Sequence, residues 1–183
     1  MSKGTLFMVV GPSGAGKDTL LAGARARLSD DPRYRFIRRT ITRPVEAGGE
    51  VHEAVTAAEF AARSASRAHF LEWHAHGLSY GISRTVLDTL NAGCHAVVNA
   101  SRSVLDQARA QYAPCRILVV TVPPALLRAR LEARGREDEA DIAKRLGRAD
   151  VFTVTGPDVV TIVNDGLVDA GVTAFLKALG ASH

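Results

Sequence analysis

Hydrophobic and polar positions alternate along this chain in two patterns. Short runs rich in Val, Ile, Leu and Phe recur between longer stretches in which apolar residues return every three or four positions. The first pattern is typical of buried strands and the second of amphipathic helices. Their alternation predicts an α/β fold with a mainly parallel central sheet flanked by helices. The predicted strands cover about 5–10, 36–40, 70–73, 78–81, 96–98, 116–122 and 159–163, and the predicted helices about 18–28, 56–67, 83–93, 103–111, 124–135, 139–149 and 167–179.

Local signals fix several ends of the predicted helices. Thr56 and Glu59 have the spacing of a capping box, in which each side chain bonds the other residue's backbone N–H. Ser83 is placed to cap the next helix. Pro124 suits the first turn of a helix, which Gly135 then ends.

Length and composition place the chain among ordinary globular proteins of one domain. It has 183 residues, of which 46% are hydrophobic and 23% charged, and this excludes collagen, a disordered tail and a disulfide scaffold. Cys94 and Cys115 each lie within or beside an apolar run, so we expect two small core residues and a reducing, cytoplasmic location. No apolar run approaches the roughly 18 residues of a membrane helix, so we expect no membrane partner.

The basic residues are unusual in kind. Four of the 23 are lysines and the other 19 are arginines, and the formal net charge is +4. Arginine presents a planar fork of donors that matches phosphate and carboxylate. The excess fits a polyanionic ligand, and it equally fits a genome whose codons favour arginine. We find no basic stripe with interleaved aromatic residues, so we expect no nucleic-acid partner.

One segment carries a specific signature of nucleotide binding. Residues 11–17 have the pattern G-x-x-x-x-G-K, directly after a predicted strand and before a predicted helix. A phosphate-binding loop requires this context, because its backbone N–H groups converge on an anion at a helix N-terminus. The lysine then reaches the β- and γ-phosphates. The ATP site predicted from this loop comprises Gly11, Pro12, Ser13, Gly14, Ala15, Gly16, Lys17, Asp18 and Thr19.

The position after the lysine departs from the motif. Asp18 stands where the motif has Ser or Thr, whose hydroxyl binds Mg²⁺. A carboxylate is also a hard ligand for Mg²⁺, so Asp18 is our candidate metal ligand; the alternative is that it only caps the helix. P-loop enzymes often place an acid for the metal at the end of a neighbouring strand, but the strand predicted at 96–98 ends in Asn99. The missing charge is then supplied by Asp18, or alternatively by Asp165.

With these segments the chain resembles the guanylate kinase group of P-loop kinases, and within it the ribose 1,5-bisphosphate phosphokinases. Guanylate kinases share the loop sequence, and Asp in place of the following Ser is typical of the ribose bisphosphate enzymes. The similarity runs from the loop to residues 164–165 and includes 39–43, 49–52, 73–81, 98–102 and 130–137. It implies one P-loop kinase domain over 1–183, with an acceptor-binding part at about 34–93 and a lid at about 125–150.

The resemblance also implies roles for individual residues. Cations of the loop and lid would neutralise the transferred phosphate, with Arg130 and Asn164 joining the ATP site. The implied catalytic set is Lys17, Asp18, Arg134, Arg136, Arg145 and Arg148. The implied acceptor site comprises Arg39, Arg43, Glu50, His52, Glu72, Trp73, Tyr80, Asn99, Ser101 and Arg102. Arginines such as Arg25, Arg27, Arg63 and Arg67 fall instead on predicted exposed helix faces and fit the codon explanation.

The departures from guanylate kinases lie in the acceptor site. The changed positions are Arg39, His52, Ile82, Asn99 and Ser101. Together they add cations and remove groups that read a base, which suits an acceptor with two phosphates and no base. Glu72 matches a glutamate that reads guanine, so a guanylate kinase remains an alternative.

The resemblance implies an ATP-dependent kinase that converts α-D-ribose 1,5-bisphosphate to 5-phospho-α-D-ribose 1-diphosphate and ADP, as in phosphonate breakdown. The implied cofactor is Mg²⁺ and the implied partner is a phosphorylated sugar. A phosphate monoester has a second pKa of about 6 and is already a nucleophile at pH 7, so this chemistry needs no general base. The alternatives are a guanylate or other nucleoside monophosphate kinase, and a non-catalytic binding module. We expect a monomer or a homodimer.

Overall fold

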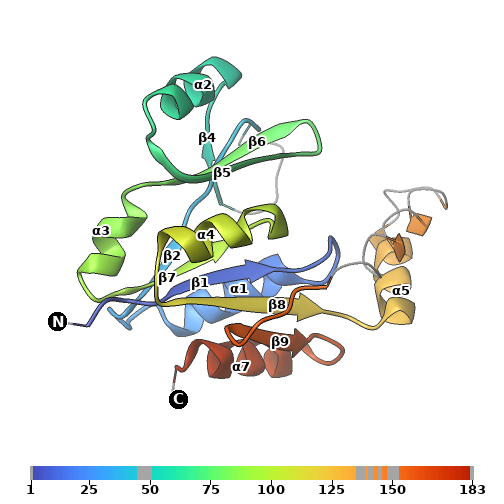
Figure 1. The fold of residues 1–183 in the computed structure, drawn as a ribbon. Coiled ribbons are helices and arrows are strands. Elements are labelled where there is room, and N and C mark those ends of the chain that lie inside the picture. Colours follow the sequence, from blue (N-terminus) through green and yellow to red (C-terminus); the bar gives the residue numbers. More distant parts are fainter. Residues whose placement is uncertain are drawn as a thin grey trace. The chain divides into compact units, whose positions relative to one another are not determined.

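The computed structural model describes residues 2–44, 51–134, 139, 142–143, 146–147 and 153–181, and only the main chain of Arg134. Five strands form one parallel sheet in the order β2-β7-β1-β8-β9, flanked by helices (Figure 1). These strands are β1 (Leu6–Val10), β2 (Tyr34–Ile37), β7 (His95–Asn99), β8 (Cys115–Thr121) and β9 (Val159–Val163). All five residues of the central strand β1 are buried, as a strand covered on both faces requires. The α/β fold expected from the sequence is confirmed.

A second, mixed sheet has the strand order β4-β3-β6-β5. It consists of β3 (Thr40–Ile41), β4 (Glu53–Ala54), β5 (His69–Ala75) and β6 (Leu78–Ser83). The predicted strands at 70–73 and 78–81 are confirmed as the core of the antiparallel pair β5 and β6. The single strand predicted over 36–40 is wrong, because its two ends belong to different sheets: β2 pairs with β7 and β3 pairs with β6.

The helices follow the sequence signals closely where those signals are specific. They are α1 (Lys17–Arg27), α2 (Ala57–Ala65), α3 (Val86–Asn91), α4 (Leu105–Gln111), α5 (Pro124–Arg134) and α7 (Val168–Leu179). Both hydrogen bonds of the capping box at Thr56 are present, and Pro124 is the first residue of α5. Most of the helix predicted at 139–149 and the predicted stop residue Gly135 lie outside the described residues, but Ile142 is buried against Leu127 and Leu131.

Two local predictions are wrong. Ser83 does not cap α3, whose N-cap is Thr85. The Ser83 hydroxyl oxygen accepts hydrogen bonds from the backbone and side chain of Thr85 and closes a turn before the helix. The two cysteines are half-buried rather than core residues and form no disulfide with each other, and the Cys94 thiol lies 3.5 Å from the Pro32 carbonyl oxygen.

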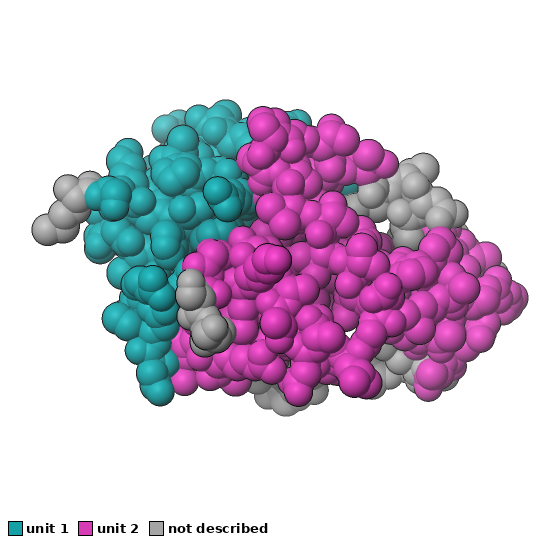
Figure 2. Space-filling view, turned by 90° about the horizontal axis from the view of Figure 1, so that it is seen from below, with its two compact units in different colours: residues 1–8, 30–116 teal, residues 9–29, 117–183 magenta. Residues whose placement is uncertain are grey.

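The chain forms two compact units (Figure 2). Unit 1 comprises residues 1–8 and 30–116 and carries the small mixed sheet; unit 2 comprises residues 9–29 and 117–183 and carries the predicted phosphate loop. In unit 2, α1 packs on α7, and a Cβ at Gly23 would overlap the Val172 side chain. Among the described residues, no helix has the length and apolar character needed to cross a bilayer.

Candidate active site

The predicted phosphate loop leaves the end of the central strand β1 and enters α1, both of which the motif requires. Gly14 and Gly16 have φ angles of 92° and 90°, in the left-handed region where a side chain is strained. Gly16 is also the N-cap of α1 and offers no capping side chain. The helix therefore begins with backbone N–H groups that an anion can accept from.

Lys17 lies within reach of the loop that it follows. Its ammonium group donates hydrogen bonds to the carbonyl oxygens of Gly11, at 2.7 Å, and Pro12, at 3.1 Å. The flexible side chain is thus held beside the loop. From this position its ammonium group can rotate toward a bound phosphate. The strand, loop and helix follow one another as the motif requires, and phosphate binding by Lys17 remains a prediction.

Asp18 is the second residue of α1 and is exposed, as is Thr19 beside it. Because Gly16 occupies the N-cap position, Asp18 does not cap the helix in the usual sense. The part of the chain that the structure describes contains no cluster of three or more His, Cys, Asp or Glu residues able to hold a metal by themselves. A site in which one carboxylate acts together with substrate phosphates is the usual arrangement for Mg²⁺, and Asp18 fits that arrangement.

Asn164 and Arg130 brace the loop from within unit 2. The buried Asn164 side chain donates a hydrogen bond of 2.7 Å to the carbonyl oxygen of Ala15, in the loop. Arg130, on α5, donates one of 2.9 Å to the Asn164 carbonyl oxygen. The Asn164 N–H donates to Thr121, at the end of β8. Both residues predicted to bind ATP therefore contact the loop or its support, and direct contact with ATP remains a prediction.

Replacing Asn164 with alanine will weaken ATP binding without touching the acceptor. The change removes the donor to the buried Ala15 carbonyl, which costs about 1–3 kcal/mol and loosens the loop. We expect the melting temperature to fall and the KM for ATP to rise about tenfold, measured by thermal unfolding and steady-state kinetics. Asn91→Ala, at the exposed end of α3, is the matched control. An unchanged KM for ATP would show that the brace does not set the loop's shape.

In unit 1, three of the predicted acceptor residues form one stack. Trp73 and Tyr80 are cross-strand partners in β5 and β6, and their rings are parallel, with centroids 5.4 Å apart. The Arg39 guanidinium lies 5.1 Å from the Tyr80 ring and 6.0 Å from the Trp73 ring. Such cation–π contacts hold a guanidinium in place over the rings. Arg39 is therefore positioned as a fixed cation, which suits a phosphate ligand.

A second pair of predicted acceptor residues lies beside that sheet. His52 is buried, and its Nε2 donates a 2.9 Å hydrogen bond to the Arg43 carbonyl oxygen. The Arg43 Nη2 lies 3.5 Å from the other His52 ring nitrogen. The buried Arg43 Nε has no hydrogen-bond partner among the described residues. A buried guanidinium N–H without a partner is costly and is available to a ligand.

Glu72 belongs to a different group of side chains. It neighbours Trp73 on β5, and successive strand residues point to opposite faces. One carboxylate oxygen accepts a 2.8 Å hydrogen bond from the Ser64 hydroxyl, and the other accepts one of 3.1 Å from His69 Nδ1. Burial acts to raise the pKa of the Glu72 carboxyl, but the hydrogen bonds from Ser64 and His69 outweigh it and hold that pKa below its usual value. Glu72 is therefore an oriented carboxylate.

The remaining acceptor candidates of unit 1 follow β7. Asn99 is buried at the end of the strand, and Arg102 is exposed. The Ser101 hydroxyl oxygen accepts hydrogen bonds from the backbone and side chain of Ser103 and caps the short 3₁₀ helix Arg102–Val104. Ser101 thus has a structural partner already.

Four predicted residues and one side chain lie outside the described part of the chain: Glu50, Arg136, Arg145, Arg148 and the side chain of Arg134.

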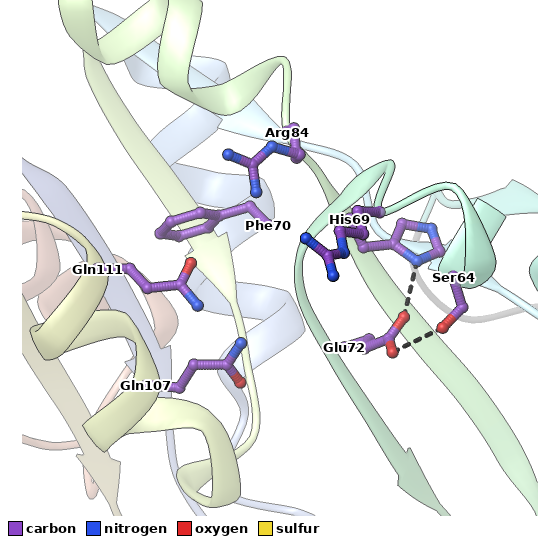
Figure 3. Close-up of a pocket in the computed structure, with 8 residues that line it drawn as sticks. Ser64, His69, Phe70, Glu72, Arg84, Gln107 and Gln111 are labelled. Atoms are coloured by element: carbon purple, nitrogen blue, oxygen red, sulfur yellow. Dashed lines mark hydrogen bonds and ion pairs between the residues drawn. The ribbon is translucent and has the colours of Figure 1, made fainter.

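A pocket in unit 1 contains residues that the sequence reasoning missed. Its volume is about 260 Å³, and it includes Glu72 and the two residues that orient it (Figure 3). The others are Arg67, Phe70, Arg84, Gln107 and Gln111. Arg67 is exposed, as the sequence predicts, but it lies just beyond the end of α2. No short motif links these positions, because they come from α2 and the turn after it, from β5, from the residue after β6 and from α4, and they meet only in the folded unit.

Comparisons with known proteins agree with this geometry. Residues 6–151 match the family of AAA domains. The chain is 47% identical over 165 residues to "Ribose 1,5-bisphosphate phosphokinase PhnN" from Thiobacillus denitrificans, covering 90% of this chain and 87% of that protein. It is 44% identical over 178 residues to the protein of the same name from Brucella melitensis, covering 97% and 92%.

Some relatives are much longer than this chain. A "Bifunctional ribose 1,5-bisphosphokinase-thymidine phosphorylase" from Azorhizobium caulinodans is 44% identical over 182 residues, which are 99% of this chain and 26% of that protein. A second bifunctional relative, from Cupriavidus pinatubonensis, is matched over 29% of its length. The chain therefore spans between a quarter and a third of these bifunctional relatives.

Solved structures share the fold at low sequence identity. A guanylate kinase from Anaplasma phagocytophilum has a TM-score of 0.66 at 17% identity, covering 98% of this chain and 86% of that one. A gluconokinase from Sinorhizobium meliloti has a TM-score of 0.54 at 15% identity, with coverage of 98% and 94%.

Proposed function

The chain belongs to the ribose 1,5-bisphosphate phosphokinase family, and on this premise we propose that it transfers the γ-phosphate of ATP to the 1-phosphate of α-D-ribose 1,5-bisphosphate. The products are 5-phospho-α-D-ribose 1-diphosphate and ADP. The observation that carries the proposal is the phosphate loop ending in Gly16 and Lys17, on a chain that is 47% identical to a single-function relative over 87% of that relative's length. Phosphoryl transfer depends mainly on positioning and charge neutralisation, and the loop supplies both.

The donor side of the reaction falls to unit 2. The backbone N–H groups at the start of α1 bind the β- and γ-phosphates, and Lys17 turns from the Gly11 and Pro12 carbonyls to the same phosphates. Asp18 would hold Mg²⁺, which when bound neutralises part of the phosphate charge. Asn164 and Arg130 keep the loop in its cradle shape. The lid arginines that complete the neutralisation are Arg134, Arg136, Arg145 and Arg148.

The acceptor side falls to unit 1. Arg39, held on the Trp73 and Tyr80 rings, and Arg43, with its buried unpartnered Nε, bind acceptor phosphate. Arg102 adds a further exposed cation at the end of β7. These groups bind and orient the nucleophile, which needs no base because a phosphate monoester is mostly dianionic at pH 7.

A coupled assay of ADP release with two acceptors tests the proposal. Purified protein with MgATP is given ribose 1,5-bisphosphate or GMP at equal concentrations. We expect a larger kcat/KM with ribose 1,5-bisphosphate. A larger value with GMP would favour a guanylate kinase, for which Glu72 is the one supporting residue. No turnover with ribose 1,5-bisphosphate, GMP or other nucleoside monophosphates would favour a non-catalytic binding module.

A further inference from the structure

The Glu72 pocket of unit 1 has no role in the proposal so far. It lies between the end of α2, the strand β5, the start of the β6–α3 connection and the helix α4. Figure 3 shows the Gln107 and Gln111 amides on one side of the pocket and the His69–Glu72–Ser64 group on the other. A volume of about 260 Å³ is small for a nucleotide and close to the lower end of ligand pockets, at about 300 Å³.

Glu72 offers two oriented acceptor oxygens to this pocket. Ser64 and His69 each use one acceptor position, and a carboxylate has about four. The two partners fix the carboxylate, and His69 is itself fixed: its ring packs on Phe60, with centroids 4.7 Å apart, and against Gly81, where an added Cβ would lie 2.7 Å from Nε2. A rigid carboxylate with acceptor positions left over is the group that binds neighbouring hydroxyls of a sugar ring, as acidic residues do for ribose in dinucleotide sites.

Two arginine side chains, Arg67 and Arg84, also line this pocket. His69 pairs with Ser83, and the Arg84 N–H donates to the Ala68 carbonyl oxygen, so the ends of β5 and β6 bring Arg67 and Arg84 near one another. Neither guanidinium has a hydrogen-bond or ion-pair partner among the described residues. Arg67 has a φ angle of 55° because it directly follows the C-cap of α2, where a left-handed residue commonly ends a helix.

The pocket also contains two side-chain amides that form no hydrogen bond with the described residues. The side chains of Gln107 and Gln111 are exposed on α4 and have no hydrogen-bond partner in the part of the chain that the structure describes. Amide N–H groups donate to phosphate and amide oxygens accept from hydroxyls. Counting partners among the described residues alone, the pocket thus combines one fixed acceptor, two unpaired guanidiniums and two unpaired amides, a set that matches a hydroxylated ring bearing a phosphate.

We propose that this pocket holds the sugar ring and the 5-phosphate of the acceptor, with Glu72 accepting from the ring hydroxyls and Arg67 and Arg84 binding the 5-phosphate. The inference rests on the proposed function, since it names where that acceptor binds. The 1-phosphate must stay free to meet the donor phosphate, so the 5-phosphate is the end that a pocket can enclose. A guanine base would also satisfy Glu72, but it carries no negative charge for the two guanidiniums.

Direct binding measurements by calorimetry test this assignment separately from turnover. The variants are Glu72→Gln and the double change Arg67→Gln with Arg84→Gln; Arg116→Gln, exposed on β8, is the matched charge control. We expect each pocket variant to raise the Kd for ribose 1,5-bisphosphate at least tenfold, since hydrogen bonds to charged groups are lost. The Kd for a non-hydrolysable ATP analogue should change less than twofold, which also reports that the variant is folded.

Two truncated ligands assign the contacts. Ribose 1-phosphate lacks the 5-phosphate, so the double arginine variant should bind it as well as the wild type does. A 2-deoxyribose 1,5-bisphosphate lacks one hydroxyl, so the effect of Glu72→Gln should shrink. If a pocket variant fails to fold, Gln107→Ala, exposed and unpartnered in the structure, should still raise the Kd for ribose 1,5-bisphosphate.

The outcomes separate this inference from the proposed function. If the wild type binds and phosphorylates ribose 1,5-bisphosphate while all pocket variants bind it normally, the pocket assignment is overturned and the function stands. If the wild type does not bind ribose 1,5-bisphosphate, the proposed function fails and this inference fails with it. If the variants lose binding of GMP instead, the pocket reads a base and the assignment to a sugar phosphate is wrong.

Discussion

Lys17→Met will lower kcat about 10²–10³-fold, the loss typical of removing one preorganised charge from a transition state. The methionine keeps the length of the side chain but cannot donate to phosphate. The Lys17 ammonium donates to the Gly11 and Pro12 carbonyl oxygens of its own loop, and we expect the loss of its contacts to lower activity far more than stability. Steady-state kinetics with MgATP and ribose 1,5-bisphosphate measure the change.

The matched control is Lys177→Met, an exposed lysine in the last turn of α7. It removes the same charge from the same unit and should leave kcat within about twofold. Thermal unfolding of both variants should show small shifts. If Lys17→Met kept more than a tenth of wild-type kcat, the loop would bind an anion without serving phosphoryl transfer.

The sequence predicted most strands of the central sheet well because they are continuous runs rich in apolar and β-branched residues. Residues 159–163 match β9 at both ends, and 116–122 matches β8 within a residue. Continuous apolar runs of this kind leave few alternative boundaries. The short strands were harder: Thr40 and Ile41 form β3 in the second sheet, but their apolar pattern continues that of β2. A two-residue strand is defined by its partners, which no local pattern contains.

The candidate site also has one part that the local sequence predicts and one part that it does not. The phosphate loop could be predicted in full, because its function depends on consecutive residues with fixed backbone demands, such as Gly14 and Gly16 at positive φ. The Glu72 pocket could not, since Arg67, Arg84 and Gln107 are far apart in sequence and ordinary surface residues in local context. The resemblance to guanylate kinases indicated Glu72 alone, because that family reads a base there.

The two halves of the site obey different physical requirements. The donor half binds a polyphosphate through backbone N–H groups, which any sequence with the right glycines can supply. On our proposal, the acceptor half must distinguish one small molecule from others, and the side chains that would do so include Arg39 on its aromatic stack and Glu72 on its two partners. Specificity therefore lies where the sequence signal is weakest.

Asp18→Ala will shift the Mg²⁺ dependence of the reaction. A carboxylate in the first turn of α1, exposed beside the phosphate loop, is placed to hold the metal together with ATP phosphates. Its loss should raise the Mg²⁺ concentration for half-maximal rate at least about tenfold, because even indirect contacts to a metal site are worth 10–100-fold in affinity. Asp18→Ser restores the usual motif residue, whose hydroxyl also binds Mg²⁺, and should be less impaired than Asp18→Ala.

Asp88→Asn separates a metal role from a helix-dipole role. Asp88 is likewise an exposed acid in the first turn of a helix, α3, and lies in the other unit. If the charge at position 18 only favours the helix N-terminus, Asp18→Ala and Asp88→Asn should both lower stability by about 0.3–1 kcal/mol and leave the Mg²⁺ titration alone. If Asp18 holds the metal, only Asp18→Ala moves the titration. Equal Mg²⁺ curves for wild type and Asp18→Ala would assign the metal to another acid, of which the exposed Asp165 beside Asn164 is the next to test.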